Sequence, residues 1–185
     1  VCPKTNESVV IDMPEDPSAM LDVAKATVVK AVLVTHGHLD HIGGYADVRA
    51  VLSAPVAIGE ADAPNLPEVP DIILTDGYEI AVGTLTVKAL HTPGHTPGST
   101  CFLIDGHLFT GDTLFPGGPG RTVSPEALAE TIESITKKLY PLDALPFYPG
   151  HGADSDLSTS SQEYQIFASR PHRPGMSGNI EWMKD

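Results

Sequence analysis

The residues THGHLDH, at positions 35–41, constrain the fold more than any other part of the chain, because they place three histidines and an aspartate within six positions. The preceding run KAVLVT (30–35) is apolar and predicts a buried strand, and the following GGYADVRAVLS (43–53) predicts a helix. The polar cluster therefore lies where a strand ends and a helix begins. Open α/β folds usually place their binding sites at such positions.

The rest of the chain alternates between strand and helix signals. Period-two alternation of apolar residues predicts a β meander over residues 71–112, and Ser124 before a proline predicts the start of a helix. No repeat, low-complexity tract or linker interrupts the pattern. We therefore predict a single α/β domain over residues 1–185, in which residues 153–185 form a C-terminal helix and an irregular tail. Further strands are expected at 8–12, 55–59 and 144–148, and further helices at 14–27, 124–140 and 160–169.

Composition limits the classes of partner. The chain carries a formal net charge of -13 and has no long run of basic residues, so it should repel nucleic acids. No segment reaches the roughly 18 consecutive apolar residues of a membrane helix, and no secretory signal is visible. Its two cysteines do not make a disulfide framework. We expect a cytoplasmic protein that acts on a small-molecule substrate, without nucleic acid or membrane partners, and the sequence leaves the oligomeric state open.

The metal-ligating residue types group by their position relative to the strands. Residues two apart at a strand end face the same way, so His36 and His38 can bind one metal ion together. Asp40 and His41 lie at the turn into the helix and point elsewhere, toward a second ion. Imidazole and carboxylate together suit zinc, with iron or manganese as alternatives. Three more candidates each follow an apolar strand, in turns that would gather at one sheet edge: His95, Asp112 and His151.

The other histidines have different interpretations. His91 opens the turn HTPGH and is a candidate for supporting a metal ligand from behind. His107 lies in a turn between two strands, where solvent exposure explains it, and neither it nor His172 is given a metal role.

Four motifs, THGHLDH, HTPGHTPGS, TGD and PGHG, in this order, resemble those of the metallo-β-lactamase superfamily. The sequence GDTLF followed by Gly120-Arg121 is similar to the glyoxalase II-like (hydroxyacylglutathione hydrolase-like) branch of that superfamily. The resemblance covers about residues 8–152 and implies a four-layer αβ/βα sandwich with metal ions at one edge between two sheets. It also implies a ligand set: His36, His38 and His95 for the first metal, Asp40, His41 and His151 for the second, and Asp112 as the bridge.

The chain departs from that branch in two places. The superfamily sheet usually opens with an extra strand, and here the N-terminal edge is expected to be incomplete. Glyoxalase II carries a C-terminal helical domain that helps bind glutathione, and too few residues follow His151 for such a domain. The resemblance therefore supports the metal chemistry more than it supports glutathione as the substrate carrier.

The expected mechanism follows from charge. Two zinc ions bridged by Asp112 would share a water or hydroxide with a pKa lowered to about 7, and one ion would polarise the scissile carbonyl. A thiol of pKa near ~8.5 leaves without help, whereas the amine of an amide needs a proton donor. The motifs offer no acid apart from metal ligands such as Asp40, which is the catalytic candidate. We therefore predict a dinuclear metal-dependent hydrolase of thioesters, or of esters and lactones.

Substrate contacts are poorly specified. The glycine-rich segment FPGGPGRT (115–122) follows Asp112 and could form a mobile rim of the site. Arg121 within it is a candidate for binding a substrate carboxylate with its planar guanidinium. The alternative, equally open, is that Arg121 ties the loop to the sheet.

Two other functions stay open. The short C-terminus and Gly120-Arg121 also resemble an iron-dependent persulfide dioxygenase, which would hold one iron on His36, His95 and Asp112. The third hypothesis is a non-catalytic metal-binding or electron-transfer module. Nothing in the sequence suggests the flavin or thiolate partner domain that such a module needs. Metal content separates the first two, because two zinc ions support hydrolysis and one iron with oxygen uptake supports the dioxygenase.

Overall fold

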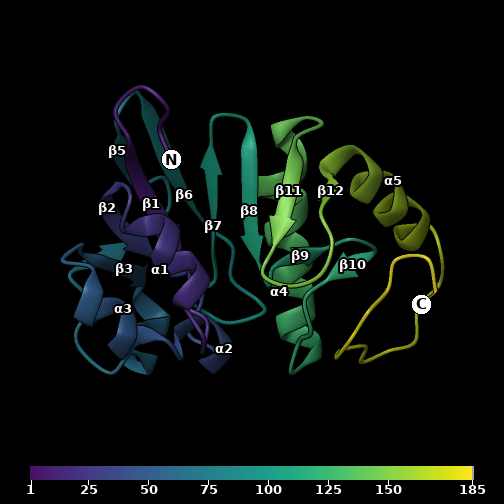
Figure 1. The fold of residues 1–185 in the computed structure, drawn as a ribbon. Helices are drawn as coiled ribbons and strands as arrows, with labels where there is room; N and C mark the ends of the chain where they lie inside the picture. The colour runs from purple at the N-terminus through teal and green to yellow at the C-terminus, as the bar shows by residue number, and fades with distance from the viewer. Residues whose placement is uncertain (185) are drawn as a thin grey trace.

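The computed structural model describes residues 1–184 and contains two sheets packed face to face between helices (Figure 1). The first sheet has four parallel strands in sequence order. The chain between its strands forms short helices, as parallel pairing requires a crossover. The strands are β1 (Glu7–Ile11), β2 (Val28–Leu33), β3 (Val56–Gly59) and β4 (Ile72–Leu74), and the intervening helices are α1 (Ser18–Ala24), α2 (Leu39–Ile42), α3 (Tyr45–Val51) and the 3-10 helix η1 (Glu60–Asn65).

The second sheet has six strands in the order β12-β11-β8-β7-β6-β5, antiparallel except where β11 runs parallel to β8. A small hairpin of two further strands, β9 and β10, extends beyond the end of β8. The strands are β5 (Glu79–Val82), β6 (Leu85–His91), β7 (Thr100–Ile104), β8 (His107–Gly111), β9 (Leu114–Phe115), β10 (Gly118–Pro119), β11 (Pro146–Pro149) and β12 (Ser155–Asp156).

Two longer helices cover the outer face of the second sheet (Figure 1). The helix α4 (Pro125–Ser134) begins at Ser124 as predicted, and the Ser124 hydroxyl accepts a hydrogen bond from the amide of Ala127 at 3.2 Å. The predicted helix over 124–140 is continued by a π turn, η2 (Ile135–Leu139), and a 3-10 turn, η3 (Tyr140–Leu142). The second helix is α5 (Leu157–Ala168).

Three apolar clusters separate four layers of structure. On β2 the side chains alternate, so that Val32 packs toward the helices while Ala31 and Leu33 pack toward the other sheet. Phe102 of β7 meets them in the cluster between the sheets. A third cluster, containing Phe147 of β11, lies under α4 and α5. This arrangement is the predicted αβ/βα sandwich, and the fold prediction is confirmed.

Two sequence interpretations need correction. The segment 71–112 is not one meander, because β4 pairs parallel with β3 in the first sheet and only β5 to β8 form the antiparallel series. The tail, which the sequence predicts only as irregular, also contributes to the core. Ile180 and Trp182 are buried at 3% and 0% exposure and belong to the cluster beneath α5. None of the helices within residues 1–184 has the length and apolar run that spanning a bilayer needs.

Candidate metal centre

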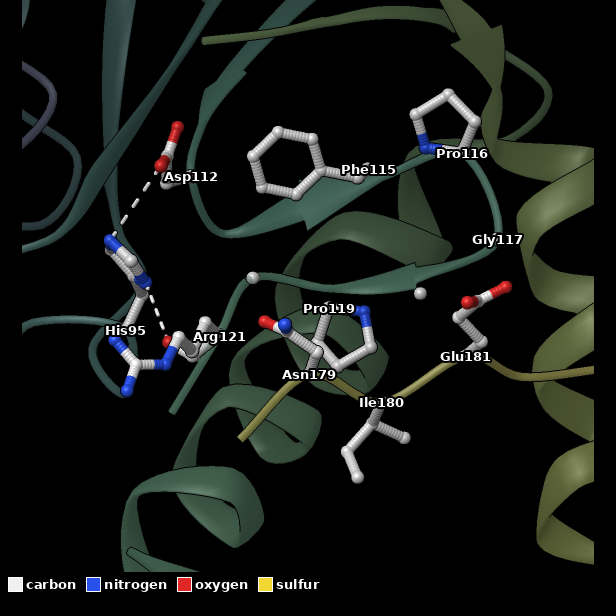
Figure 2. Close-up of a pocket in the computed structure, with 12 residues that line it drawn as sticks. His95, Asp112, Phe115, Pro116, Gly117, Pro119, Arg121, Asn179, Ile180 and Glu181 are labelled. Carbon is white, nitrogen blue, oxygen red and sulfur yellow. Dashed lines mark hydrogen bonds and ion pairs between the residues drawn. The ribbon is translucent and has the colours of Figure 1, made fainter. Parts of the chain in front are cut away.

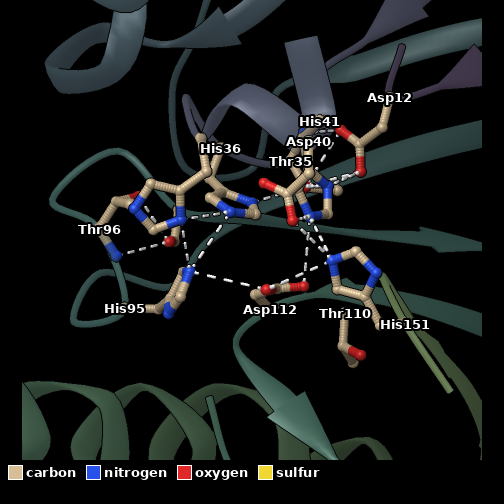
Figure 3. A network of polar contacts seen from close by, with 12 residues as sticks. Asp12, Thr35, His36, Asp40, His41, His95, Thr96, Thr110, Asp112 and His151 are labelled. Carbon is tan, nitrogen blue, oxygen red and sulfur yellow. Dashed lines mark hydrogen bonds and ion pairs between the residues drawn. The ribbon is translucent and has the colours of Figure 1, made fainter. Parts of the chain in front are cut away.

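The seven candidate ligands gather at one edge of the sandwich, where the two sheets meet, and Figure 3 labels six of them. The segment THGHLDH follows β2 of the first sheet, and its Asp40 and His41 lie in the short helix α2. The turns that carry the other candidates follow three strands of the second sheet, so the site draws on both sheets. These are His95 after β6, Asp112 after β8 and His151 after β11.

Three imidazole nitrogens converge at one end of the site. The Nδ1 atom of His38 lies 3.0 Å from Nε2 of His36 and 3.0 Å from Nε2 of His95, and the two Nε2 atoms are 3.3 Å apart. Nitrogens bound tetrahedrally to one zinc at about 2.0–2.1 Å would be about 3.3 Å apart. The observed triangle therefore fits one metal ion, and these three residues form a potential metal-binding group.

A second group lies beside the first. The Nε2 atom of His151 is 3.0 Å from Oδ2 of Asp40 and 3.2 Å from Nε2 of His41, and the three residues form another potential metal-binding group. His41 is buried, whereas the side chains of Asp40 and His151 are 58% and 52% exposed. The second group therefore opens toward solvent.

Asp112 lies between the two groups (Figure 3). Its Oδ1 is 3.4 Å from Nε2 of His41, and its Oδ2 is 3.8 Å from Nε2 of His95 and 3.9 Å from Nε2 of His151. Among the described residues Oδ1 is buried without a hydrogen-bond partner, a state that is costly unless a cation satisfies the oxygen. Gly150 keeps this space open, because a Cβ there would lie 2.5 Å from Oδ1.

Hydrogen bonds behind the imidazoles leave the convergent nitrogens free. His95 donates from Nδ1 to the carbonyl of Arg121 at 2.8 Å, and Nδ1 of His41 lies 2.8 Å from Oδ2 of Asp12. The Thr35 hydroxyl donates to Asp12 at 2.8 Å, so it can accept from Nδ1 of His36 at 3.1 Å. Each contact places a proton on Nδ1 and points Nε2 into the centre, as supporting residues do in metal sites.

The charges around the centre suit a cation. Burial, with His41 and His95 nearby, lowers the pKa of His36 to about 2. Burial also opposes a charge on His41, but its contacts with Asp112 and Asp12 prevail and raise the pKa of His41 to about 10. Against the effect of burial, His41 also holds the pKa of Asp112 below its ordinary value. The site thus already holds a positive charge that a metal ion would replace.

The sequence analysis did not identify two carboxylates that support the site, Asp12 and the buried Asp62. Asp12, at the end of β1, accepts hydrogen bonds from the amide and hydroxyl of Thr35 and contacts His41. Asp62, in η1, accepts from the amides of Gly37 and Gly98 and from the Thr96 hydroxyl. Neither lies in a motif, and the only signal in the sequence was an acidic residue just after a strand.

The remaining candidates lie around the centre. His91 supports the turn that carries His95, since its Nε2 lies 3.0 Å from the carbonyl oxygen of Pro97. His107 is exposed against Tyr148, and His172 stacks on a ring of α5, so neither reaches the centre. Arg121 ties its loop to the site through its backbone carbonyl, and its guanidinium makes no ion pair within residues 1–184.

Together, the fold and the site define a two-sheet αβ/βα sandwich with a histidine-rich centre at the shared edge. The chain belongs to the metallo-beta-lactamase superfamily, because the model of that family matches residues 6–161.

Among curated relatives, the chain is similar to a hydroxyacylglutathione hydrolase of Anaeromyxobacter dehalogenans, with 40% identity over 141 residues that cover 75% of this chain and 54% of the relative. The chain thus spans about half the length of that relative. Among solved structures it is similar to the BLEG-1 B3 metallo-beta-lactamase (TM-score 0.77, 28% identity, 85% of this chain and 87% of that one). It is also similar to ETHE1 from Myxococcus xanthus (TM-score 0.74, 28% identity, 86% of this chain and 73% of that one).

Proposed function

We propose that the chain is a dinuclear metal-dependent hydrolase of thioesters, or of esters and lactones. The supporting observation is the pair of adjacent metal-binding groups with the Asp112 carboxylate between them. When bound, two divalent ions, zinc by the preference of these ligands, would polarise a carbonyl and lower the pKa of a water. The first ion would be held by His36, His38 and His95 and the second by Asp40, His41 and His151, with Asp112 ligating both.

The candidate ligands have different roles according to how deeply they are buried. His36 and His41 lie on the closed side of the site and fix its geometry. Asp40 lies on the open side, 3.0 Å from His151, where its carboxylate can orient an incoming water or hold a proton. This position makes Asp40 the catalytic candidate.

The leaving group decides which substrates fit. The acids at the centre, Asp40 and Asp112, are themselves candidate ligands, and the nearby carboxylate of Asp12 is engaged by Thr35 and His41. A thiolate leaves without a proton donor, whereas an amine does not. The likeness to a hydroxyacylglutathione hydrolase supports thioesters, and the likeness to a B3 metallo-beta-lactamase makes a β-lactam the amide to compare. Arg121, exposed beside His95, is our candidate for binding a substrate carboxylate.

The test pairs elemental analysis of the purified protein with a panel of a thioester, an ester, a lactone and a β-lactam. We expect two zinc ions per chain and turnover of the thioester. His38→Ala removes one corner of the first triangle and should abolish turnover while leaving the fold largely intact by circular dichroism. His107→Ala, which removes an exposed histidine outside the centre, is the matched control. Undiminished thioester turnover in His38→Ala would overturn the proposal.

The iron-dependent dioxygenase is the second candidate. Two histidines and one carboxylate are the usual ligands of non-haem iron oxygenases, and His36, His95 and Asp112 adjoin one another here. The structural similarity to ETHE1 supports this second candidate function. One iron per chain together with oxygen uptake on a persulfide, and no hydrolysis, would favour it over the hydrolase.

A further inference from the structure

A cavity of about 330 Å³ opens beside the metal centre, on the side of His95 and Asp112 (Figure 2). One wall is the glycine-rich loop 115–121. The other is formed by residues of the C-terminal segment 178–182, which we name the C-terminal strap. The family model ends at residue 161. It therefore covers the candidate metal centre on one side of the cavity, but not the C-terminal strap on the other side.

The strap is anchored at both ends. Gly178 and Thr122 exchange two backbone hydrogen bonds of 2.9 and 3.1 Å. At the other end the amide of Trp182 donates to the carbonyl of Gly117 at 2.7 Å, and its fully buried indole packs 4.8 Å from the ring of Phe167. The strap is therefore a fixed wall of the cavity.

Side chains alternate along the strap as in an extended strand. Ile180 and Trp182 are buried in the cluster under α5, whereas Asn179 and Glu181 are exposed and line the cavity. Figure 2 shows Ile180 pointing away from the side on which Asn179 and Glu181 lie. The polar side chains of the strap therefore face whatever enters.

The lining combines three kinds of group. Arg121 supplies a guanidinium, Phe115 and Pro119 supply apolar rings, and the strap supplies the polar side chains of Asn179 and Glu181. A carboxamide both donates and accepts, and a carboxylate accepts from N–H groups. A hydrocarbon chain laid there would remove water from these groups without replacing its hydrogen bonds, which is unfavourable. A short apolar stem that continues into an amide would fit all three kinds of group.

We propose that the C-terminal strap is the specificity wall of the substrate pocket, where Asn179 and Glu181 bind an amide-bearing arm of the substrate. Asn179 pairs with both the N–H and the C=O of the arm, and Glu181, whose Oε2 also pairs with the Lys184 ammonium at 2.6 Å, accepts from an N–H. This proposal rests on the proposed hydrolase function, because the arm belongs to a molecule whose scissile carbonyl lies beside His95 and Asp112.

The first experiment compares two thioesters of acetate with equal chain length. One carries N-acetylcysteamine, which has an amide, and the other carries pentanethiol, which does not. The wild type should prefer the first, and Asn179→Ala should lower the ratio of the two kcat/KM values about ten-fold, mainly through KM. Gln165→Ala, an exposed amide on α5, is the matched control and should keep the ratio. An unchanged ratio in Asn179→Ala overturns the strap proposal, whereas turnover of neither thioester overturns the hydrolase.

The second experiment needs no turnover and decides the strap proposal in either case. The chain has one tryptophan, so its indole N–H gives one nuclear magnetic resonance signal, from Trp182. The probe is N-acetyl-S-(2-oxopropyl)cysteamine, in which a ketone replaces the thioester, titrated into metal-free and metal-loaded protein. We expect saturable shifts of the Asn179 side-chain amide and the indole, and a Kd about ten-fold weaker in Asn179→Ala. Absence of saturable shifts, or an equal Kd in both proteins, contradicts the proposal.

Discussion

Asp62 shows how one buried carboxylate can hold two ligand-bearing turns together. Its Oδ2 accepts from the amide of Gly37, which lies between two candidate ligands, at 2.8 Å, and from the hydroxyl of Thr96, next to His95, at 2.6 Å. Its Oδ1 accepts from Gly98 at 3.0 Å, and the residue is 1% exposed. Since the two turns come from different sheets, Asp62 fixes the separation of the three convergent imidazoles.

Asp62→Asn should therefore weaken metal binding at the triangle of His36, His38 and His95. An amide keeps the shape but turns one acceptor into a donor that faces N–H and O–H groups, so the turns must shift. We expect a loss of about 10- to 100-fold in affinity for the first metal, measured by chelator competition, with the fold retained. Asp71→Asn is the control, because it changes a carboxylate that also accepts from a backbone amide, that of Val56, but makes no hydrogen bond or ion pair with the ligand-bearing turns among the described residues. Equal metal affinity in the two variants would contradict the role of Asp62.

The sequence predicts the adjacency of seven side chains but not the residues that support them. Ligand candidates such as His36 and His38 stand out because their spacing at a strand end has a chemical meaning. Asp12 and Asp62 are single acidic residues outside the motifs, and their partners lie 23 to 36 positions away. Only tertiary packing selects such partners. His91 is intermediate, because its place in a turn motif suggested the supporting contact that the structure shows.

Among the secondary-structure elements, too, local patterns were predicted and tertiary pairings were not. The strands that precede the ligands were predicted, since apolar runs followed by turn residues mark a buried strand wherever it pairs. The pairing of β4 with β3 was not predicted. The alternation of apolar residues in β4 would be the same in either sheet, and the path of residues 60–70 decides which sheet β4 joins. The strap was missed because Ile180 and Trp182 are too few apolar positions to set a period within a tail rich in glycine and proline.

Gly118 controls how closely the strap approaches its loop. A Cβ at this position would lie 2.3 Å from the carbonyl oxygen of Ile180, which is backbone and cannot rotate away. Gly118→Ala should displace the strap and destabilise the protein by about 1–3 kcal/mol, the usual effect of overpacking, as measured by urea unfolding. The emission of Trp182 should shift toward longer wavelength as its burial is lost. Val123→Ala, at an 84% exposed position beside the same loop, is the control and should match the wild type in both measurements. If Gly118→Ala also matches the wild type, the contact at Gly118 does not hold the strap in place.

Because the candidate ligands come from both sheets, metal ions bound by them would contribute to the stability of the whole molecule. The turn after β2 supplies four of the candidate ligands, and the turns of the second sheet supply the other three. The sheets are otherwise joined by the apolar cluster between them and by a few contacts such as those of Asp62. A bound ion would connect the two sheets at this edge, and it would bind the folded chain alone.

Metal should therefore raise the melting temperature in steps that follow occupancy. Free zinc at about one hundred times its Kd stabilises the folded state by about 2.7 kcal/mol per site, which corresponds to about 5–10 °C for a chain of this size. Chelation should reverse the shift, because it removes the ion whose binding stabilises the folded chain. His38→Ala should keep the increment from the second site and lose the one from the first, whereas His107→Ala should show both. If neither zinc nor chelator changes the melting temperature of the wild type, the seven side chains do not bind ions between the sheets. If His38→Ala shows the full increment, the first ion is bound elsewhere.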